Sequence, residues 1–338
     1  SIIPPRFIKN RTVMTVGFIG YGRFAKLRDK CLTHSDVLDV EIVGYFDPYC
    51  DNEKLKRFST IESILEKVDA VIISVPPSLA PGYVQLSLKA GKNVFCEKPA
   101  AISSDSLNEI DEDLSHNNVL AYGFNHRVHP SAIKIKHFID SKKLGDILWM
   151  RGRYGKEVDD NYSNTWRCNK ALNGGGILID QGIHLVDLMS HLSGGFDGAQ
   201  AVLSNNYLNI DGVDDNGFIT LYSASKKISA SIHTTITQWR YIFSLEIFLE
   251  KGSIVLNGIR TKSGKYGDEI LTITPNAMNE KKISFSEEIF ADNISWQKEI
   301  DAFLISCDAG VSYPYAGFED AQKTTALIDL IYKKAVWI

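Results

Sequence analysis

The first 124 residues alternate short apolar runs with stretches of helical character. The apolar runs cover residues 13–19, 40–46, 70–75, 93–96 and 119–124, and helical stretches at 23–33, 61–68, 81–90 and 104–117 lie between them. Strands that are apolar on both sides are typical of parallel sheets covered by helices on both faces. The regular alternation therefore predicts an α/β fold that begins with a doubly wound parallel sheet.

The first predicted strand leads directly into a glycine-rich turn with the pattern Gly20-x-Gly22-x-x-Ala25. Gly20 permits the tight turn, Gly22 lets a pyrophosphate approach the backbone, and Ala25 lets the helix lie close to the sheet. The helix then presents free N–H groups and a positive dipole end to the phosphates. An ordinary glycine turn could have the same pattern. In this chain the pattern lies at the first strand-to-helix turn, and that position favours a dinucleotide site. We expect Arg23 and Phe24 to contact the cofactor together with the two glycines.

Asp47 ends the second predicted strand, slightly more than the usual ~20 residues after the glycine turn. A carboxylate at this place accepts hydrogen bonds from the ribose hydroxyls and repels a 2′-phosphate. No arginine directly follows Asp47. The sequence therefore favours NAD over NADP as the cofactor.

The pattern changes after about residue 131. A helical stretch at 131–141 and a strand at 146–154 are followed by a helix at 177–192, β-type runs at 217–222, 228–237, 242–249 and 253–257, and two closing helices at 294–307 and 318–334. Short polar connections at 225–227 and 250–252 are typical of hairpins. We predict a C-terminal α/β domain with a large, mostly antiparallel open sheet. The domains are placed at 1–126 and 127–338, with a last helix that can pack back on the first domain.

Lys98 directly follows the fourth predicted strand, between Glu97 and Pro99. Ligands of open α/β sheets bind beyond the carboxyl ends of the strands, so this lysine is expected on the cofactor side. Its ammonium group could hydrogen-bond a reacting hydroxyl, and desolvation beside a cofactor would lower its pKa. The alternative is a surface lysine, with Pro99 starting a helix.

A second cluster follows three consecutive glycines at 174–176. Glycine at a helix start lets the backbone approach a ligand. Asp180 and His184 are four residues apart and share one helix face, where the carboxylate can orient a histidine that exchanges protons near neutral pH. Such a pair is also compatible with a structural role, and Asp187 is interpreted as a cap or salt-bridge partner.

A polar stretch with aromatic residues at 151–167 precedes this cluster. Its amides and carboxylates suit the hydroxyls of a sugar-like ring, and Tyr154 or Trp166 suits the ring's apolar face. Arg167, together with Arg127, could meet a carboxylate or a phosphate. A solvated loop is the alternative interpretation.

The composition of the chain limits the partners and the cellular compartment that we expect for it. A net charge of −4 over 338 residues argues against a nucleic-acid partner, which favours a basic stripe. The five cysteines are scattered, so neither a disulfide framework nor a metal ion is expected and a reducing cytoplasm fits best. The first five residues lack the pattern of a signal peptide, and no apolar run predicts a membrane span.

These motifs, in this order and spacing, resemble the glucose–fructose oxidoreductase / inositol dehydrogenase / rhizopine-catabolism (Gfo/Idh/MocA) family over nearly the whole chain. The resemblance rests on the glycine turn, the run 70–77 that includes Val75 and Pro76, the run 90–99, Asn125 with Arg127, Trp166-Arg167, and the block 174–187. The family often has a histidine shortly after the prolines at 76–77, where this chain has Ala80. The cofactor pocket is therefore expected to differ locally.

The resemblance implies a Rossmann domain and an open-sheet domain whose exposed face serves a homodimer or homotetramer. It also implies that Lys98, Asp180 and His184 form the catalytic group, with His184 as proton acceptor in oxidation. Val75, Pro76, Glu97 and Lys98 would line the cofactor site. The substrate would contact Lys98, Asn125, Arg127, Tyr154, Trp166, Arg167, Asp180 and His184.

The expected activity is hydride transfer between NAD(H) and a hydroxyl of a sugar, cyclitol or nucleotide sugar. The segment 166–184 is similar to family members associated with bacterial surface-polysaccharide biosynthesis. Two other readings stay open: a redox-neutral glycosidase that uses bound NAD transiently, and a regulator that binds NAD without turnover. Net release of NADH distinguishes a dehydrogenase from both.

Overall fold

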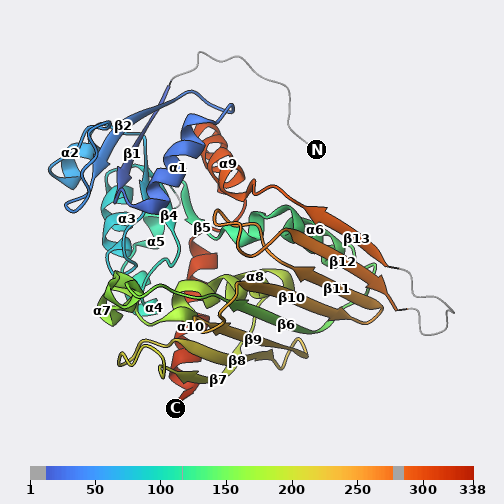
Figure 1. Cartoon of the computed structure of the whole chain (residues 1–338). Coiled ribbons are helices and arrows are strands. Elements are labelled where there is room, and N and C mark those ends of the chain that lie inside the picture. Colours follow the sequence, from blue (N-terminus) through green and yellow to red (C-terminus); the bar gives the residue numbers. More distant parts are fainter. Residues whose placement is uncertain (1–12, 116, 277–284) are drawn as a thin grey trace.

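The computed structural model describes residues 13–115, 117–276 and 285–338; the five opening residues read for a signal peptide lie outside this part. The N-terminal sheet has five parallel strands in the order β2-β1-β3-β4-β5 (Figure 1). The strands are β1 (Met14–Ile19), β2 (Val40–Phe46), β3 (Ala70–Ile73), β4 (Asn93–Glu97) and β5 (Leu120–Gly123). All four residues of β3 and of β5 are buried, as expected for strands covered on both faces.

The helices between these strands are α1 (Arg23–Thr33), α2 (Ile61–Leu65), α3 (Ala80–Lys89), α4 (Ser104–Leu107) and α5 (Glu112–Ser115). The sequence predicted one helix over 104–117, and the structure has two short ones. Ser103 caps α4 with its side chain, and the helix ends at Asn108 after a single turn. The single long helix was therefore wrong.

Two C-terminal helices pack back on the N-terminal sheet. The last one, α10 (Phe318–Lys334), accepts a hydrogen bond from the Ser104 amide through Asp329 (2.7 Å). The helix before it, α9 (Ser295–Ala309), lies beside α1 (Figure 1). Its Phe303 meets the ring of Phe95 at 5.6 Å. The sequence allowed this return for α10 but did not anticipate it for α9.

The second sheet has nine strands in the order β13-β12-β11-β10-β6-β9-β8-β7-β14. They are β6 (Ile147–Gly155), β7 (Gly198–Ser204), β8 (Asn216–Ser223), β9 (Ile228–Thr235), β10 (Ile242–Leu249), β11 (Gly252–Asn257), β12 (Glu269–Pro275), β13 (Ser286–Phe290) and β14 (Ala335–Trp337). Neighbours are antiparallel except β6 with β9 and β7 with β14. The mostly antiparallel sheet is thereby confirmed, and both expected hairpins occur, between β8 and β9 and between β10 and β11.

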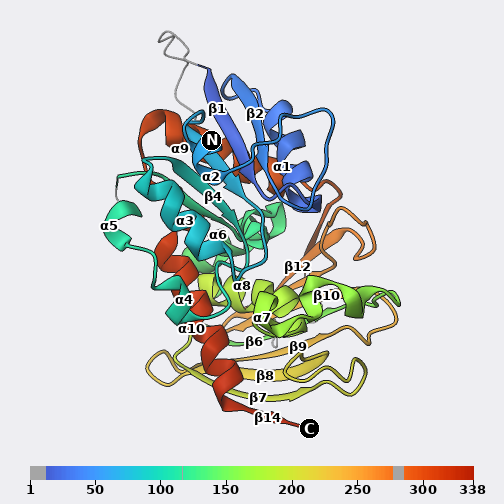
Figure 2. The ribbon, with the colours of Figure 1, turned by 90° about the vertical axis from the view of Figure 1, so that its left-hand side faces the viewer.

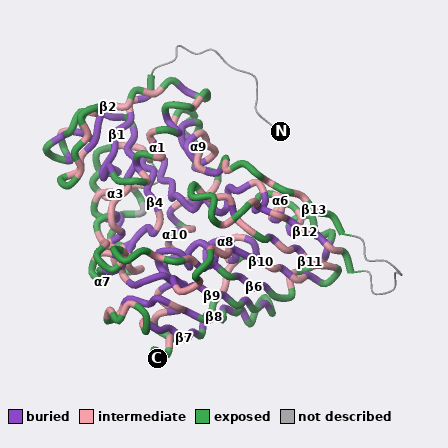
Figure 3. The backbone as a smooth tube through the Cα atoms, in the orientation of Figure 1, coloured by how far each residue is buried: buried purple, intermediate pink, exposed green. Residues whose placement is uncertain are grey.

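In the described part of the chain, helices pack on one face of this sheet, and the other face carries exposed side chains. The remaining helical segments are η1 (Asn125–Val128), α6 (Pro130–Asp140), η2 (Tyr162–Asn164), η3 (Trp166–Cys168), α7 (Lys170–Asn173), a π-helix (Leu178–Gly182) and α8 (Ile183–Ser193). Side chains alternate along β8, with Phe218 and Tyr222 exposed and Ile219 buried. Figure 2 shows α10 running down beside the sheet, and Figure 3 shows buried residues concentrated along α8 and the strands.

The α/β class and the two-sheet arrangement predicted from the sequence are confirmed. The division proposed between residues 126 and 127 falls inside η1, the short helix that leads from β5 toward α6. The carboxyl ends of the parallel strands, η1 and the π-helix before α8 supply the residues of the candidate site.

Candidate active site

The glycine turn after β1 has the geometry of a phosphate cradle. Gly20 has a φ of +79°, and a Cβ there would lie 2.4 Å from the Ser74 carbonyl oxygen, so only glycine fits. A Cβ on Gly22 would meet nothing within 4 Å, and Gly22 begins α1 without a side-chain cap. The turn and the first amides of α1 therefore fit the pyrophosphate of a dinucleotide.

Asp47 lies next to this turn, at the end of β2. Its carboxylate accepts hydrogen bonds from the amides of Tyr21 and Tyr49, both at 2.8 Å. These bonds fix the carboxylate beside the turn, where the ribose of a bound dinucleotide would lie. Arg23 is exposed, whereas Phe24 stacks on Trp296 of α9 with ring centroids 5.7 Å apart.

Val75 and Pro76 follow β3 and are partly exposed. A Cγ of Val75 would lie 2.8 Å from a Cβ on Gly20, so this valine borders the glycine turn. The predicted contacts of these two residues with the cofactor stay predictions.

Glu97 takes part in a buried ion pair. Its Oε1 accepts a hydrogen bond from Arg28 Nε at 2.7 Å, and the same guanidinium reaches Glu299 of α9 at 2.7 Å. Arg28 is fully buried, so it requires both partners. One oxygen of Glu97 is therefore already engaged, and the ion pair fixes the end of β4 immediately before Lys98.

Lys98 reaches the π-helix from β4. Its Nζ donates a hydrogen bond to the Asp180 carbonyl oxygen at 2.5 Å and lies 3.9 Å from Asp180 Oδ1. The peptide bond to Pro99 is cis. Burial lowers the pKa of Lys98, an effect that the neighbouring Asp180 carboxylate partly opposes. This is the environment in which a lysine can exchange protons or donate a strong hydrogen bond.

Three cations surround the Asp180 carboxylate. Besides Lys98, Lys156 Nζ lies 3.5 Å from Oδ2 and Arg167 Nε lies 3.3 Å from Oδ1. Burial alone would raise the pKa of Asp180, but the charges of Lys156, Lys98 and Arg167 outweigh burial and lower it. Asp180 is therefore ionised at neutral pH.

His184 stacks on a second buried histidine that the sequence interpretation missed. The rings of His184 and His126 lie 3.9 Å apart at 23°. His184 Nδ1 and His126 Nε2 are buried and have no hydrogen-bond partner among the described residues. Burial lowers the pKa of both rings, which therefore stay neutral at pH 7. The only sequence signal for His126 was its position between Asn125 and Arg127.

The π-helix that carries Asp180 is held by residues distant in sequence. Asp214 accepts hydrogen bonds from Gly176 N (2.8 Å), Leu178 N (2.7 Å) and the Tyr332 hydroxyl (2.7 Å). A Cβ on Gly176 would lie 1.9 Å from the Asp214 carbonyl oxygen, and one on Gly175 would lie 2.1 Å from the Tyr332 hydroxyl. The sequence interpretation that these glycines let the backbone approach a ligand was wrong, because they approach Asp214 and Tyr332. π-Helical turns are frequent at functional sites.

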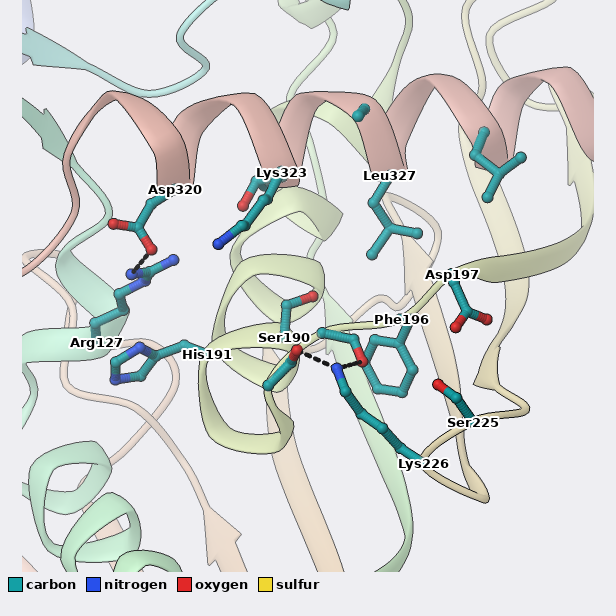
Figure 4. A pocket seen from close by; sticks show the side chains of 15 residues that line it. Arg127, Ser190, His191, Phe196, Asp197, Ser225, Lys226, Asp320, Lys323 and Leu327 are labelled. Atoms are coloured by element: carbon teal, nitrogen blue, oxygen red, sulfur yellow. Dashed lines mark hydrogen bonds and ion pairs between the residues drawn. The ribbon is translucent and has the colours of Figure 1, made fainter.

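Arg127 does not reach the substrate side. Its guanidinium is paired with Asp187 at 2.7 Å and with Asp320 at 2.8 Å. Figure 4 shows Arg127 and Asp320 at one end of a separate cleft lined by α8, α10 and the turn at Ser225 and Lys226. The expected substrate contact of Arg127 is corrected to a buried link between η1, α8 and α10, and Asp187 is its salt-bridge partner.

The other expected substrate residues lie at different depths. Asn125 is buried behind the histidines, with its amide nitrogen 3.2 Å from Ser295 Oγ. The buried Tyr154 ring lies 6.2 Å from that of His184 and 5.2 Å from that of Tyr266. Trp166 lies under the Arg167 guanidinium at 4.5 Å. The structure thus brings Lys98, Asp180, His184, Tyr154 and Arg167 into one neighbourhood.

Neither a metal site nor a membrane span occurs in the described ranges. No group of three or more His, Cys, Asp or Glu side chains there could hold a metal ion. No helix of this part is long and apolar enough to cross a bilayer. All five cysteines are free thiols.

Two family models match consecutive parts of the chain. Residues 14–125 match the oxidoreductase family with an NAD-binding Rossmann fold, and residues 132–255 match the GFO/IDH/MocA C-terminal domain. Together the two matches include the glycine turn, Lys98, Asp180 and His184.

Sequence relatives include two proteins named as dehydrogenases. Levoglucosan dehydrogenase of Pseudarthrobacter phenanthrenivorans is 29% identical over 175 residues, covering 48% of this chain and 45% of that protein. The chain thus aligns with less than half of that relative. Inositol 2-dehydrogenase of Rhizobium meliloti is 23% identical over 333 residues, covering 94% of this chain and 96% of that protein.

A solved structure of levoglucosan dehydrogenase in complex with NADH and levoglucosan has the same fold. The TM-score is 0.84 at 21% identity, with 96% of this chain and 97% of that chain covered. At this identity the likeness shows the arrangement of the two sheets.

Proposed function

The chain belongs to the GFO/IDH/MocA family of NAD-binding oxidoreductases, and from this we propose that it transfers a hydride between NAD(H) and a carbon bearing a hydroxyl or keto group on a sugar, cyclitol or nucleotide sugar. The main support is the convergence of Lys98, Asp180 and His184 at the carboxyl end of β4. This edge of the parallel sheet also carries the glycine turn, so substrate and cofactor would meet there.

His184, Lys98 and Asp180 have different roles in the proposed oxidation. Bound NAD supplies the hydride acceptor at nicotinamide C4. His184, held neutral by burial, takes the proton of the substrate hydroxyl as the hydride leaves the carbon. Lys98 donates a hydrogen bond to the reacting oxygen and stabilises the negative charge that develops on it. Asp180 positions Lys98 and offsets its charge.

The test is production of NADH from a panel of sugars, cyclitols and nucleotide sugars, preceded by a thermal-stability screen with each dinucleotide. Ligands that bind the folded state raise the melting temperature by mass action. Selective stabilisation by NAD(H) followed by turnover supports the proposal. No stabilisation by any dinucleotide would overturn it.

Replacing Asp47 with Ala is expected to weaken NAD binding and to relax discrimination against NADP. Removing the carboxylate removes its hydrogen bonds to the ribose of NAD and its repulsion of the 2′-phosphate of NADP. Each loss is expected to change the Kd of the corresponding dinucleotide by about tenfold. The ratio of the Kd values for NAD⁺ and NADP⁺ measures this directly. An unchanged ratio of the two Kd values would show that Asp47 does not bind the ribose and does not discriminate between the two dinucleotides.

We also propose a homodimer or homotetramer formed through the open face of the nine-stranded sheet. Trp149 stacks on Phe248 with centroids 4.1 Å apart, and Phe218 stacks on His233 at 4.2 Å. Phe218 is 56% exposed. Large exposed apolar patches mark interaction surfaces, and one repeated on a second copy is self-complementary.

Replacing Phe218 with Glu is expected to shift the protein from oligomer to monomer in size-exclusion chromatography with light scattering. A charge in the middle of a buried apolar contact would be desolvated without a partner. Leu86→Glu, on the exposed side of α3, serves as the control and should leave the mass unchanged. A monomeric wild-type protein would contradict the interface.

The free cysteines support a reducing compartment, and we propose that the protein acts in the cytoplasm. A role in surface-polysaccharide biosynthesis is supported only by the segment 166–184 and stays a hypothesis.

A further inference from the structure

The substrate side of the site carries more positive than negative charge. Lys98, Lys156 and Arg167 all lie within 4 Å of one carboxylate, that of Asp180. Four ionised groups in this arrangement leave a formal charge of +2. Even with Lys98 uncharged, Lys156 and Arg167 exceed Asp180 by one charge.

Three acidic side chains that adjoin the cluster in the chain or hold the π-helix are already engaged. Glu97 is bound to the buried Arg28. Glu157 is exposed and pairs with Lys265 at 3.6 Å. Asp214 is saturated by two amides and the Tyr332 hydroxyl. Asp159 and Asp160 of the loop are exposed and form no ion pair with these cations in the described ranges, so Asp180 is the carboxylate that lies within 4 Å of them there.

Lys156 and Arg167 retain unused donors. Arg167 contacts Asp180 through Nε alone, and its terminal nitrogens have no partner within the described ranges. Lys156 Nζ lies 3.5 Å from Asp180 and 5.2 Å from the centre of the Tyr162 ring. The two side chains are 18% and 26% exposed, so they are largely desolvated but still reachable by a ligand.

Partly desolvated cations in excess are costly unless a ligand supplies the missing negative charge. The reacting hydroxyl cannot do so, because it is neutral before and after the reaction. The two residues flank the polar loop at 156–167, whereas Lys98 and His184 enter from β4 and α8. These two cations therefore come from a different segment of the chain than the groups proposed to act on the reacting atoms.

We propose that the substrate is an anionic sugar, whose carboxylate or phosphate binds Arg167 and Lys156 while its reacting hydroxyl faces Lys98 and His184. This inference rests on the proposed function, since it concerns the substrate of the same site. Arg167 can bind either group through two parallel hydrogen bonds from its free nitrogens, with its plane supported by Trp166. A neutral sugar would leave both cations unpaired.

The experiment measures ligand binding to the enzyme–NADH complex by calorimetry, with neutral and anionic members of matched pairs. The pairs are glucose with glucose 6-phosphate, glucuronamide with glucuronate, and N-acetylglucosamine with UDP-N-acetylglucosamine; inorganic phosphate is added as a simple anion. The anionic member of at least one pair is expected to bind on the order of 10- to 100-fold more tightly, the size of a charged hydrogen bond. The pair that responds distinguishes a carboxylate from a phosphate or a diphosphate.

Substitutions of the two cations test whether they cause the preference for the anionic ligand. Arg167→Met and Lys156→Met should each remove most of the preference for the anion, while Arg167→Lys should restore part of it. Lys143→Met removes an exposed positive charge remote from the loop and should keep the full preference. NADH affinity is measured for each variant, because it reports an intact fold.

If no anionic ligand, phosphate included, binds the NADH complex more tightly than its neutral counterpart, the proposal is wrong. A preference that survives both methionine substitutions overturns the assignment of Arg167 and Lys156. Failure of NADH itself to bind would instead overturn the proposed function.

Discussion

Lys98→Met is expected to lower kcat for oxidation by about 10²–10⁴-fold, the range of a lost acid–base or charge-stabilising group. The substitution removes the ammonium group that hydrogen-bonds the Asp180 carbonyl and that we propose to face the reacting oxygen. Methionine fills a similar volume, and the glycine turn proposed to hold the pyrophosphate belongs to a different strand end, that of β1. The Kd of NADH should therefore change by less than about threefold.

Steady-state kinetics with fluorescence titration of NADH measures both quantities. Lys89→Met, in the exposed last turn of α3, is the matched control and should behave like the wild type. A Lys98→Met enzyme with normal turnover would remove this lysine from the mechanism. Loss of NADH binding in that variant would show that Lys98 serves the cofactor instead.

His184→Asn is expected to reduce the oxidation rate by a similar factor of about 10²–10⁴ and to remove the acidic limb of its pH profile. Asparagine can occupy the space beside His126 but cannot accept the proton of the hydroxyl. Reduction of the keto substrate should suffer as well, since the same group returns the proton.

The position of the acidic limb follows from the direction of the pKa shift. Burial, reinforced by the charge of Lys98, lowers the pKa of His184 well below its ordinary value of 6.5. The neutral ring is the active form in oxidation, and it persists as the pH falls until the folded-state pKa is reached. Wild-type kcat/KM should therefore stay level through pH 6.5, where an ordinary histidine is half protonated, and fall only at lower pH.

A limb centred at 6.5 or above would contradict the buried neutral ring. A limb that survives unchanged in His184→Asn would mean that another group takes the proton. His126, whose ring lies against that of His184, would then be the first alternative.

The sequence predicted those parts of the fold whose signals are local. The apolar runs of the first sheet, the hairpins at 225–227 and 250–252, and the helix at 318–334 all appear in the structure. The short edge strands β13 and β14 carry mostly exposed or half-buried residues, so no apolar alternation marked them. The position of α9 depends on Arg28 pairing with Glu299, 271 residues away, which no local pattern reveals.

The candidate site divides in the same way. Gly20 and Gly22 are recognisable from the sequence because the geometry of a single local turn explains both glycines. The glycines at 175–176 were misinterpreted because their neighbours, Asp214 and Tyr332, are 38 and 156 residues from Gly176. Arg127 looked free for a substrate because its partner Asp187 lies 60 residues later in the chain. His126 gave no signal beyond its place between Asn125 and Arg127, since the burial of its ring and its stacking on His184 depend on the three-dimensional structure.

Because the π-helix is anchored on Asp214 and Tyr332, the support of the groups proposed to be catalytic is separate from the loop proposed to select the substrate. The π-helix that carries Asp180 is held by the loop before β8 and by α10, whereas the loop at 156–167 is proposed to contact the rest of the substrate. Lys156 and Arg167, at the ends of that loop, pair with Asp180, but substitutions between them can accumulate without removing the bonds that Asp214 makes to the π-helix. A protein built this way can explore new substrates at little risk to its reaction, which makes the scaffold a promising starting point for directed evolution.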